Sequence, residues 1–553
     1  MKYDFKKSYI GFITDGVIKF KDSIGVLGIL TLIMGIITLL SSFLFSYYVD
    51  AIEKAEDYSM IWGFLIVYGI VMLAKSGVGF LYSYLTSKSN LKIANDISVF
   101  CLQKLQKVSL LSSGNLNSVY LSERINSDSN VLSNFLVFSV NGLWLNVLMI
   151  LVVQIILMLT DLKIGLLLMA GYLLYAISYI CFIKPIYNKM LEYRETTANY
   201  LKGMNEQIDM IMYIQTNNLF DTFIGRFIKS FKILFKKGIS YQVTSNMIGL
   251  IQGIIYLLVS GVVIYFGGRN VIGDTITIGR FTLIYTLSVS LLGNITNLAN
   301  LAQGYQVAKS SYARMQEIMG MQELPNGETV IDEVKNIEVD DLSFAYDENS
   351  GFRNFSQSFE MGKSYCLTGE NGSGKSTFIS ILSGIYSHKF GRILINGTDV
   401  NDIDMRMFRE KHLSVMFQNN SFQEGNAIEY ICETLKREYS VKEIYKHIMS
   451  LGLDDLAMDF LELATMDMKD VNKLSGGEKQ KVDIVRMLMK DAPIMIFDEA
   501  TANLDLPAKE QFVRYLKSVR GKKLIIVISH ESFDGDVFDL YVDMNQYRNE
   551  KME

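Results

Sequence analysis

Cysteine and histidine are both scarce in this sequence, with four of each among 553 residues. Cys101, Cys181, Cys366 and Cys432 form no C-x-x-C pair and stand near no histidine cluster with metal-binding spacing. This scarcity excludes a disulfide framework, and we expect four reduced, unpaired thiols. Because every histidine lies after residue 387, no histidine metal site can form in the first two thirds of the chain.

Charge is limited as well: the net charge is -5 and charged residues make up 20% of the chain. A balance this close to neutral gives no reason to expect nucleic acid as a partner. The average hides a strongly apolar part up to about residue 305 and a remainder of ordinary soluble composition. Since 553 residues are too many for one compact domain, we predict two parts with different surroundings.

Six apolar stretches reach the length of about 20 residues that a helix needs to cross a bilayer. Buried helices of soluble proteins seldom run this long without charge, so we predict transmembrane helices. The basic N-terminus precedes no short apolar segment with a small-residue cleavage site, so the first span is expected to be retained. The spans are predicted at 24–49, 60–86, 131–159, 163–187, 246–267 and 278–302, within a transmembrane domain at 1–315.

Lysine and arginine are distributed unevenly between the loops. Five lysines precede the first span, whereas 50–59 holds four acidic residues and only Lys54. The segments 88–130 and 184–245 are basic, so the positive-inside rule puts both in the cytoplasm with the N-terminus and the C-terminal part. The abundance of Lys, Asn, Ile and Tyr is associated with AT-rich bacterial genomes, which suggests a multi-pass protein of a bacterial plasma (inner) membrane.

The two long cytoplasmic segments keep helical periodicity, so the spanning helices are expected to continue beyond the membrane. Turns at the ends of these extensions, near 115–122 and 213–222, are predicted to contact the C-terminal part.

Polar side chains inside the spans point to a pathway, because polar groups are costly in lipid and tend to face the bundle interior. Hydrogen bonding between helices explains any single one equally well. A stripe at every third residue of the sixth span nevertheless favours a cavity wall for a neutral, amphipathic cargo. The stripe is Asn294, Asn297, Asn300 and Gln303; Asn141, Asn146, Gln154 and Gln252 can face the same space, and the candidate cargo contacts are Asn294, Asn297, Asn300, Gln252 and Asn141.

A glycine-rich loop matching G-x-x-x-x-G-K-[ST] follows a predicted strand at 364–368 and precedes a predicted helix. Its backbone N–H groups and the helix N-terminus can hold phosphates, Lys375 can neutralise the β- and γ-oxygens, and Ser376 can ligate Mg²⁺. We therefore predict binding of ATP or GTP. The loop residues assigned to the nucleotide are Gly369, Asn371, Gly372, Gly374, Lys375, Ser376 and Thr377.

An apolar run at 494–497 ends in two carboxylates, Asp498 and Glu499. Alone, the run is more typical of an apolar strand that ends in solvated acids. Beside a phosphate-binding loop it indicates that Asp498 reaches the Mg²⁺ shell and Glu499 polarises the attacking water.

The segment Leu-Ser-Gly-Gly-Glu at 474–478 completes a set of motifs that resembles the ATP-binding cassette (ABC) transporters. The chain is similar to an exporter-type half-subunit over nearly its whole length. The resemblance implies an all-α six-helix transmembrane domain followed by an α/β P-loop ATPase domain, here at 336–553. It further implies ATP and Mg²⁺ as cofactors and ATP hydrolysis coupled to transport.

The resemblance also implies roles for residues outside the loop. Tyr346 matches the aromatic residue that stacks on adenine, Gln418 the sensor of γ-phosphate and Mg²⁺, Asp505 the loop that reaches across a dimer, and His530 the γ-phosphate contact. The implied catalytic residues are Glu499, His530, Lys375 and Gln418, and the implied metal ligands are Ser376, Gln418 and Asp498.

In this family two ATPases meet head to tail, so Ser475, Gly476 and Gly477 are expected to close over the nucleotide of a partner. Since the motifs are intact, we expect a homodimer, with a heterodimer left open. The segment 463–473 departs from the Thr-x-Val-Gly-Glu pattern of many exporters, which leaves its contact with the membrane helices undefined. No peptidase domain before the first span and no regulatory domain after His530 are expected.

These features predict alternating-access export of an amphipathic cargo, either a peptide of the bacteriocin or modified-peptide type or a hydrophobic drug. Two alternatives stay open: an importer of a siderophore-like compound, and an ATP-gated sensor or channel. Fold alone cannot choose the cargo.

Overall fold

The structure is a computed structural model that describes residues 8–53, 59–109, 118–347, 350–387, 390–418, 425–465, 471–501, 504–529 and 536–548. The chain divides into two compact units. The first comprises Met1–Gln106 and Leu116–Gly320, and the second Lys107–Asn115 and Met321–Glu553.

In the described part of the first unit every regular element is a helix. Six of its described helices are long and apolar enough to cross a membrane. The largest has 53 residues, which at 1.5 Å per residue is about 80 Å, far more than the ~30 Å of a hydrocarbon core. The helices are α1 (Tyr9–Lys19), α2 (Lys21–Glu53), α3 (Ser59–Leu105), α5 (Ser118–Thr160), α6 (Leu162–Asp209), α7 (Ile211–Thr216), α8 (Phe220–Ile272) and α9 (Ile278–Met319).

The helix α9 lies at the centre of the apolar packing in this unit. Leu283, Leu287 and Leu291 follow one another at four-residue spacing and are buried together. They pack with buried side chains of α5, α6 and α8, among them Val153 and Val263. The helix that carries the predicted polar stripe is therefore held in place on several sides.

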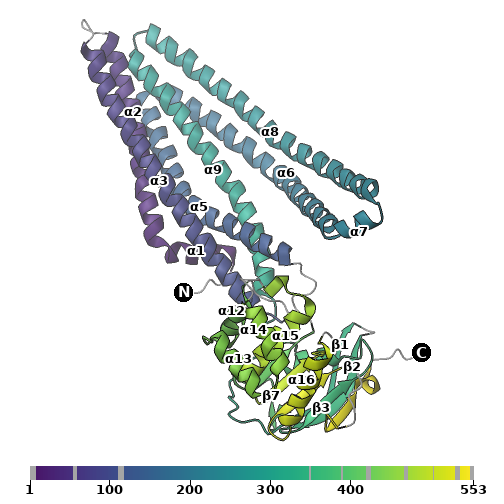
Figure 1. The fold of residues 1–553 in the computed structure, drawn as a ribbon. Coiled ribbons are helices and arrows are strands. Elements are labelled where there is room, and N and C mark those ends of the chain that lie inside the picture. The colour runs from purple at the N-terminus through teal and green to yellow at the C-terminus, as the bar shows by residue number, and fades with distance from the viewer. Residues whose placement is uncertain are drawn as a thin grey trace. The chain divides into compact units, whose positions relative to one another are not determined.

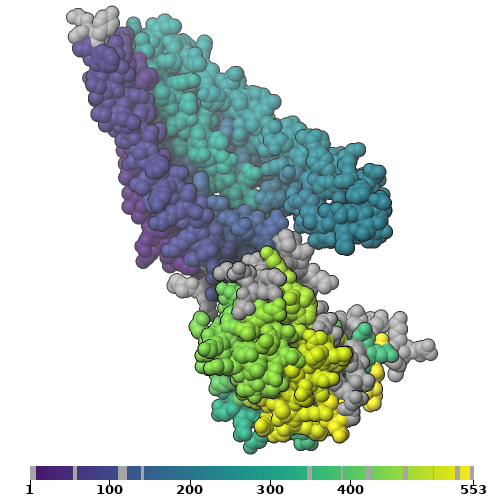
Figure 2. Space-filling view, viewed as in Figure 1, coloured from purple at the N-terminus to yellow at the C-terminus, as the bar shows by residue number. Residues whose placement is uncertain are grey.

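The helices α6, α7 and α8 form a hairpin that diverges from the other helices of this unit toward α7 (Figure 1). Along the hairpin Tyr200 stacks on Phe227 with ring centroids 4.6 Å apart. In the space-filling view its α7 end forms a separate lobe (Figure 2). The predicted contact turn at 213–222 falls here, whereas 115–117 of the other predicted turn lie outside the described residues.

The C-terminal end of α2 and the N-terminal end of α9 are joined by polar contacts. Asp50 of α2 accepts hydrogen bonds from the Thr277 hydroxyl (2.9 Å) and the Gly279 N–H (2.6 Å). The Ser46 hydroxyl donates to the Gly279 carbonyl at 2.7 Å. A Cβ at Gly279 would lie 2.2 Å from the Ser46 carbonyl oxygen, so only glycine allows this approach.

The variant Gly279→Ala should therefore force α2 and α9 apart and destabilise the unit by about 1–3 kcal/mol, the usual cost of overpacking. Gly293→Ala on the same helix is the control, because a Cβ there meets nothing within 4 Å. Alanine favours helix by up to ~1 kcal/mol over glycine, so the control should be neutral or stabilising. Equal unfolding midpoints for the two variants in detergent would contradict the close contact.

The second unit contains two sheets. The four-stranded antiparallel sheet has the order β2-β1-β4-β5, and the five-stranded parallel sheet the order β6-β7-β8-β3-β9. The strands are β1 (Asn336–Asp347), β2 (Ser350–Glu360), β3 (Ser364–Thr368), β4 (Phe390–Ile395), β5 (Thr398–Asp399), β6 (Leu413–Met416), β7 (Ile494–Asp498), β8 (Leu524–Ile528) and β9 (Leu540–Asp543). Both β7 and β8 are buried throughout, as strands covered on two faces should be.

Helices surround the parallel sheet and complete two apolar cores. Residues 107–109 belong to this unit because the Ser109 N–H donates to the Gln322 carbonyl (3.0 Å) and the Leu324 N–H to the Lys107 carbonyl (2.8 Å). The helices are α10 (Lys375–Leu382), α11 (Met405–Lys411), α12 (Ala427–Leu435), α13 (Val441–Ser450), α14 (Asp454–Thr465), α15 (Gly476–Lys490) and α16 (Leu506–Ser518), with short 3₁₀ turns at Val471–Lys473 and Met544–Tyr547.

Candidate functional site

The glycine-rich loop connects β3 to α10, so its backbone leads directly into a helix N-terminus. Gly369 (φ 143°), Gly372 (φ 86°) and Gly374 (φ 94°) have positive φ values that side chains rarely tolerate. A Cβ at Gly374 would also lie 2.6 Å from the Phe352 ring. Ser376 and Thr377 occupy the first turn of α10, and Asn371 is exposed in the loop. This geometry can present N–H groups to phosphate oxygens.

Lys375 lies folded against the loop that precedes it. Its ammonium group donates to the carbonyls of Gly369 (2.7 Å) and Glu370 (2.9 Å) and is largely buried. Burial lowers the pKa of Lys375, and the nearby charges of Glu499 and Asp498 partly offset that effect. The loop lysine and the two carboxylates therefore belong to one site, and the ammonium can exchange carbonyl contacts for phosphate oxygens.

The carboxylates stand at the end of β7. Asp498 is buried, and Glu499 follows with φ 54°, an unusual backbone conformation for this residue type. The Glu499 N–H donates to the Ile528 carbonyl of β8 at 3.0 Å. Gln418, just after β6, donates from Nε2 to a Glu499 carboxylate oxygen at 2.7 Å. Gln418 and Glu499, which are 81 positions apart, thus meet at the carboxyl edge of the parallel sheet.

The segment at 474–478 begins α15. Ser475 is the N-cap, and its side chain accepts from the Glu478 N–H while the Glu478 carboxylate accepts from the Ser475 N–H at 2.6 Å. Gly476 and Gly477 form the first turn, and Ser475 and Gly476 are exposed. Further along, Gln480 donates to the Glu499 carbonyl at 3.3 Å. The motif thus forms the exposed N-terminus of α15. The same helix also contacts Glu499, the candidate general base.

Asp505 caps α16 by accepting from the Ala508 N–H at 3.0 Å. Its carboxylate also pairs with Lys481 of α15 at 3.0 Å, and Lys481 binds Asp459 of α14 at 2.7 Å. The Ala508 N–H and Lys481 lower the pKa of Asp505. Within one chain Asp505 and Lys481 therefore link α14, α15 and α16. The motif did not indicate this local role.

Three other predicted site residues are described only in part or not at all. His530 is outside the described residues. Tyr346 lies in β1 and Asn141 in α5, but their side chains are not among those described. His412, which is not among the predicted catalytic residues, has Nε2 2.7 Å from the Ile331 carbonyl oxygen.

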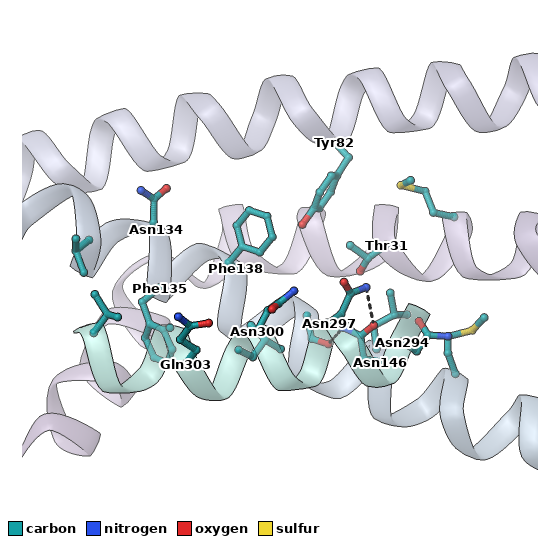
Figure 3. Close-up of a pocket in the computed structure, with 18 of the residues that line it drawn as sticks. Thr31, Tyr82, Asn134, Phe135, Phe138, Asn146, Asn294, Asn297, Asn300 and Gln303 are labelled. Carbon is teal, nitrogen blue, oxygen red and sulfur yellow. Dashed lines mark hydrogen bonds between the residues drawn. The ribbon is translucent and has the colours of Figure 1, made fainter. Parts of the chain in front are cut away.

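A cavity of about 970 Å³ lies among α2, α3, α5, α6, α8 and α9 of the helical unit. Asn294, Asn297, Asn300 and Gln303 of the predicted stripe all line it, together with Asn146 (Figure 3). Gln252 is on α8 and does not line it, and the Gln154 amide instead donates to the Gly165 carbonyl at 2.9 Å.

Several lining residues were missed by the sequence analysis. Tyr82, Phe135 and Phe138 add aromatic surface, and Arg194 and Tyr241 come from the long extensions of α6 and α8. Aromatic residues inside an apolar helix carry no signal of their own. Arg194 was counted only among the basic residues that orient the loops, because sequence does not show which face of the α6 extension it occupies.

Replacing Lys375 by methionine should weaken ATP binding by about 10–100-fold, because hydrogen bonds to charged groups contribute about 1.5–3 kcal/mol. Titration with a fluorescent ATP analogue in detergent measures this change. Lys442→Met, on the exposed face of α13, is the matched control and should bind as the unmodified protein does. Unchanged affinity of Lys375→Met would show that the ammonium stays on its loop carbonyls.

Comparison with known proteins agrees with this arrangement. Residues 24–295 match the family "ABC transporter transmembrane region" and residues 352–502 the family "ABC transporter". The solved structure of a bacterial Atm1-family ABC exporter with ATP bound has the same fold, with a TM-score of 0.81 at 19% identity over 97% of this chain and 95% of that one.

Two curated relatives have different printed functions. An ATP-dependent lipid A-core flippase of Francisella tularensis is 28% identical over 294 residues, 52% of this chain and 48% of the flippase. The chain thus matches about half the length of that relative. The putative multidrug export ATP-binding/permease protein YgaD of Bacillus subtilis is 24% identical over 473 residues, 84% of this chain and 81% of YgaD.

The predicted fold class, a six-helix transmembrane domain followed by an α/β ATPase domain, is thereby confirmed. With the membrane region and the ATPase fused in one multi-pass chain, the protein belongs to the ABC transporters as an exporter-type half-transporter.

Proposed function

We propose that two copies of this chain form an ATP-driven exporter that moves an amphipathic cargo out of the cytoplasm by alternating access. The observation that carries this proposal is the 970 Å³ cavity between the membrane helices of a chain that also carries an ATPase domain. Its mixture of amides, methionines and aromatic rings suits an amphipathic molecule. A bacteriocin-type or modified peptide and a hydrophobic drug are the cargo classes we propose.

The names of the relatives support export of amphipathic molecules. One is a lipid A-core flippase, another a putative multidrug export protein, and the solved neighbour is an exporter. These two curated relatives are bacterial, which supports a bacterial inner membrane, and the distribution of lysine and arginine supports the ATPase in the cytoplasm. An importer of a siderophore-like compound and an ATP-gated channel remain as the alternatives that the experiment below separates.

Exposed apolar surface on the α6–α8 hairpin supports a dimer. Ile208, Met212 and Ile228 are 60%, 74% and 48% exposed in a segment that extends beyond bilayer length. The N-terminus of α15 is exposed as well, so it is accessible to a nucleotide bound by another copy. A second copy of the same chain can cover both surfaces with closed two-fold symmetry.

The residues proposed for Mg²⁺ fit that ion. Ser376, Gln418 and Asp498 would contribute hydroxyl, amide and carboxylate oxygens, the hard ligands that Mg²⁺ prefers beside phosphates. The ion would neutralise charge on the β- and γ-phosphates. In our assignment Glu499 orients and deprotonates the attacking water, Gln418 holds the Glu499 carboxylate, Lys375 binds phosphate oxygens, and Tyr346 and His530 contact adenine and γ-phosphate.

Closure of two ATPases over two ATP molecules would drive the change of access. Moving a two-state equilibrium from 1:99 to 99:1 takes about 5.5 kcal/mol of differential binding. In this mechanism the α7 turn, at the end of two long helices, transmits closure to the membrane helices and the cavity opens outward. Hydrolysis then resets the dimer.

The test uses purified full-length protein in liposomes with the ATPase domains facing outward. ATP, but not ADP, should drive fluorescent amphiphilic drugs and acylated peptides into the lumen, and Glu499→Gln should abolish uptake. Cargo leaving preloaded vesicles upon ATP addition would support the importer instead. Ion currents that persist in Glu499→Gln with ATP bound would support the channel, and either result would overturn export.

A further inference from the structure

The amides that line the cavity fall into two groups. In one group the side chains are already engaged: Asn294 donates to the Ser290 carbonyl at 3.1 Å, and Asn297 donates to the Asn146 side chain at 3.4 Å. Asn146 in turn donates to the Gly142 carbonyl at 2.5 Å. Figure 3 shows the Asn297–Asn146 contact as a dashed line. The Asn297–Asn146 contact joins α9 to α5, the other two bonds lie within one helix, and each of these three amides already donates one hydrogen bond to the protein.

The other group is unengaged. Asn300 and Gln303 stand one and two turns further along α9, toward the end where Asn134 and Phe135 lie in Figure 3. Among the residues that the structure describes, no hydrogen-bond partner is found for the side chains of Asn300 and Gln303, and no ion-pair partner for Arg194. All three line the same cavity. These three side chains therefore offer hydrogen-bond donors to the same cavity.

The charge of the lining is one-sided. Arg194 is the only formally charged residue among the described lining residues, and no aspartate or glutamate accompanies it. A guanidinium stays charged at any physiological pH and binds carboxylate or phosphate through two parallel hydrogen bonds. A positive group without a counter-ion in a partly enclosed site favours an anionic partner.

The position of Arg194 along α6 fits a head group. It lies 32 residues after Leu162, which is about 48 Å along the helix. Since the hydrocarbon core is about 30 Å thick, Arg194 lies beyond its inner boundary, on the extension of α6, in the proposed orientation. Met34 and Met149 line the cavity farther along α2 and α5 and offer apolar surface to a chain.

We infer that the cargo is an anionic amphiphile: its acidic group is bound by Arg194, Asn300 and Gln303, and its apolar chain lies along the methionine and aromatic surface of the cavity. This inference rests on the proposed export function and replaces the neutral cargo expected from sequence alone. The acidic group can be a carboxylate, as in an acylated peptide, or a phosphate, as in a lipid.

Three probes with the same chain length test the inference: N-dodecanoylglycine, N-dodecanoylglycinamide and dodecyl phosphate. Full-length protein in phosphatidylcholine liposomes is assayed for ATP-dependent uptake and for stimulation of ATP hydrolysis. The acid should act at about tenfold lower concentration than its amide, the ratio expected when one charge-assisted contact is lost. The response to dodecyl phosphate relative to the carboxylate identifies which acidic group the site prefers.

Substitutions test which residues cause the preference for the acid over the amide. Arg194→Gln should reduce the acid-to-amide preference to about one, and Arg194→Lys should retain part of it, since lysine keeps the charge but not the paired hydrogen bonds. Arg269→Gln, the same substitution at the far end of α8, should keep the full preference. Asn300→Ala together with Gln303→Ala should weaken both probes, because both keep polar head groups.

Two outcomes would overturn the inference while leaving export intact. One is ATP-driven uptake of the amide at the same or lower concentration than the acid. The other is an acid preference that Arg194→Gln leaves unchanged, which would mean that Arg194 serves only the lipid interface. Absence of ATP-driven uptake for these probes and for every drug and peptide in the preceding test would instead refute the proposed function.

Discussion

Glu499→Gln should lower ATP turnover by about 10²–10⁴-fold, the usual contribution of a general base, while leaving ATP binding intact. Glutamine keeps the size of the side chain and can still bond to Gln418, whose Nε2 lies 2.7 Å from the carboxylate oxygen. An amide cannot take the proton of the attacking water. The variant should therefore accumulate as a closed dimer with ATP bound, measured as nucleotide that remains with the protein through gel filtration.

The matched control is Glu510→Gln, on the exposed surface of α16, which should hydrolyse ATP at the unmodified rate. If Glu499→Gln hydrolyses ATP at that rate as well, the base is another group. The backbone supports Glu499, because its φ of 54° costs roughly 1 kcal/mol or more and such strain clusters at functional sites.

The ATPase motifs could be predicted well because each one is local. A phosphate loop needs glycines with positive φ next to a helix N-terminus, and Gly369, Gly372 and Gly374 reveal that requirement in the sequence. The capping box at Ser475 and Glu478 is likewise written within four residues. Membrane spans are equally local, since length and apolarity alone define them.

Contacts between distant elements could not be predicted. Asp50 and Gly279 are 229 positions apart, and nothing in either neighbourhood indicates that α2 and α9 meet there. The amide stripe predicted a cavity wall. It did not show that Asn294 and Asn297 donate hydrogen bonds to other groups of the protein. For Arg194, sequence indicated only a cytoplasmic loop charge. Which residues contact one another, and which side of a helix lines the cavity, depend on the tertiary fold.

A further contact between distant elements is an ion pair in which the carboxylate is buried and the arginine is half-buried. Arg314 of α9 binds the carboxylate of Asp128 of α5 through two contacts, one of them from Nε at 3.0 Å. Asp128 is 1% exposed. Arg124, one turn before Asp128, donates to the Arg314 carbonyl at 2.7 Å and pairs with Glu317. This network joins α5 and α9 outside their predicted spans, and these two helices carry the amides that line the cavity.

Arg314→Met should destabilise the helical unit by about 3–5 kcal/mol, because it leaves the buried Asp128 carboxylate without a partner. Asp128→Leu combined with Arg314→Met should recover most of that loss, since replacing both members of a buried pair by apolar groups is often neutral. The measurement is the free energy of unfolding in mixed micelles.

The control is Lys202→Met, which removes an exposed pair with Glu206 at 3.9 Å and should change the free energy of unfolding by less than about 0.5 kcal/mol. A double variant as unstable as Arg314→Met would mean that the loss comes from the other contacts of Arg314, such as those with Ser310 and Ser311, and not from the unpaired Asp128 carboxylate.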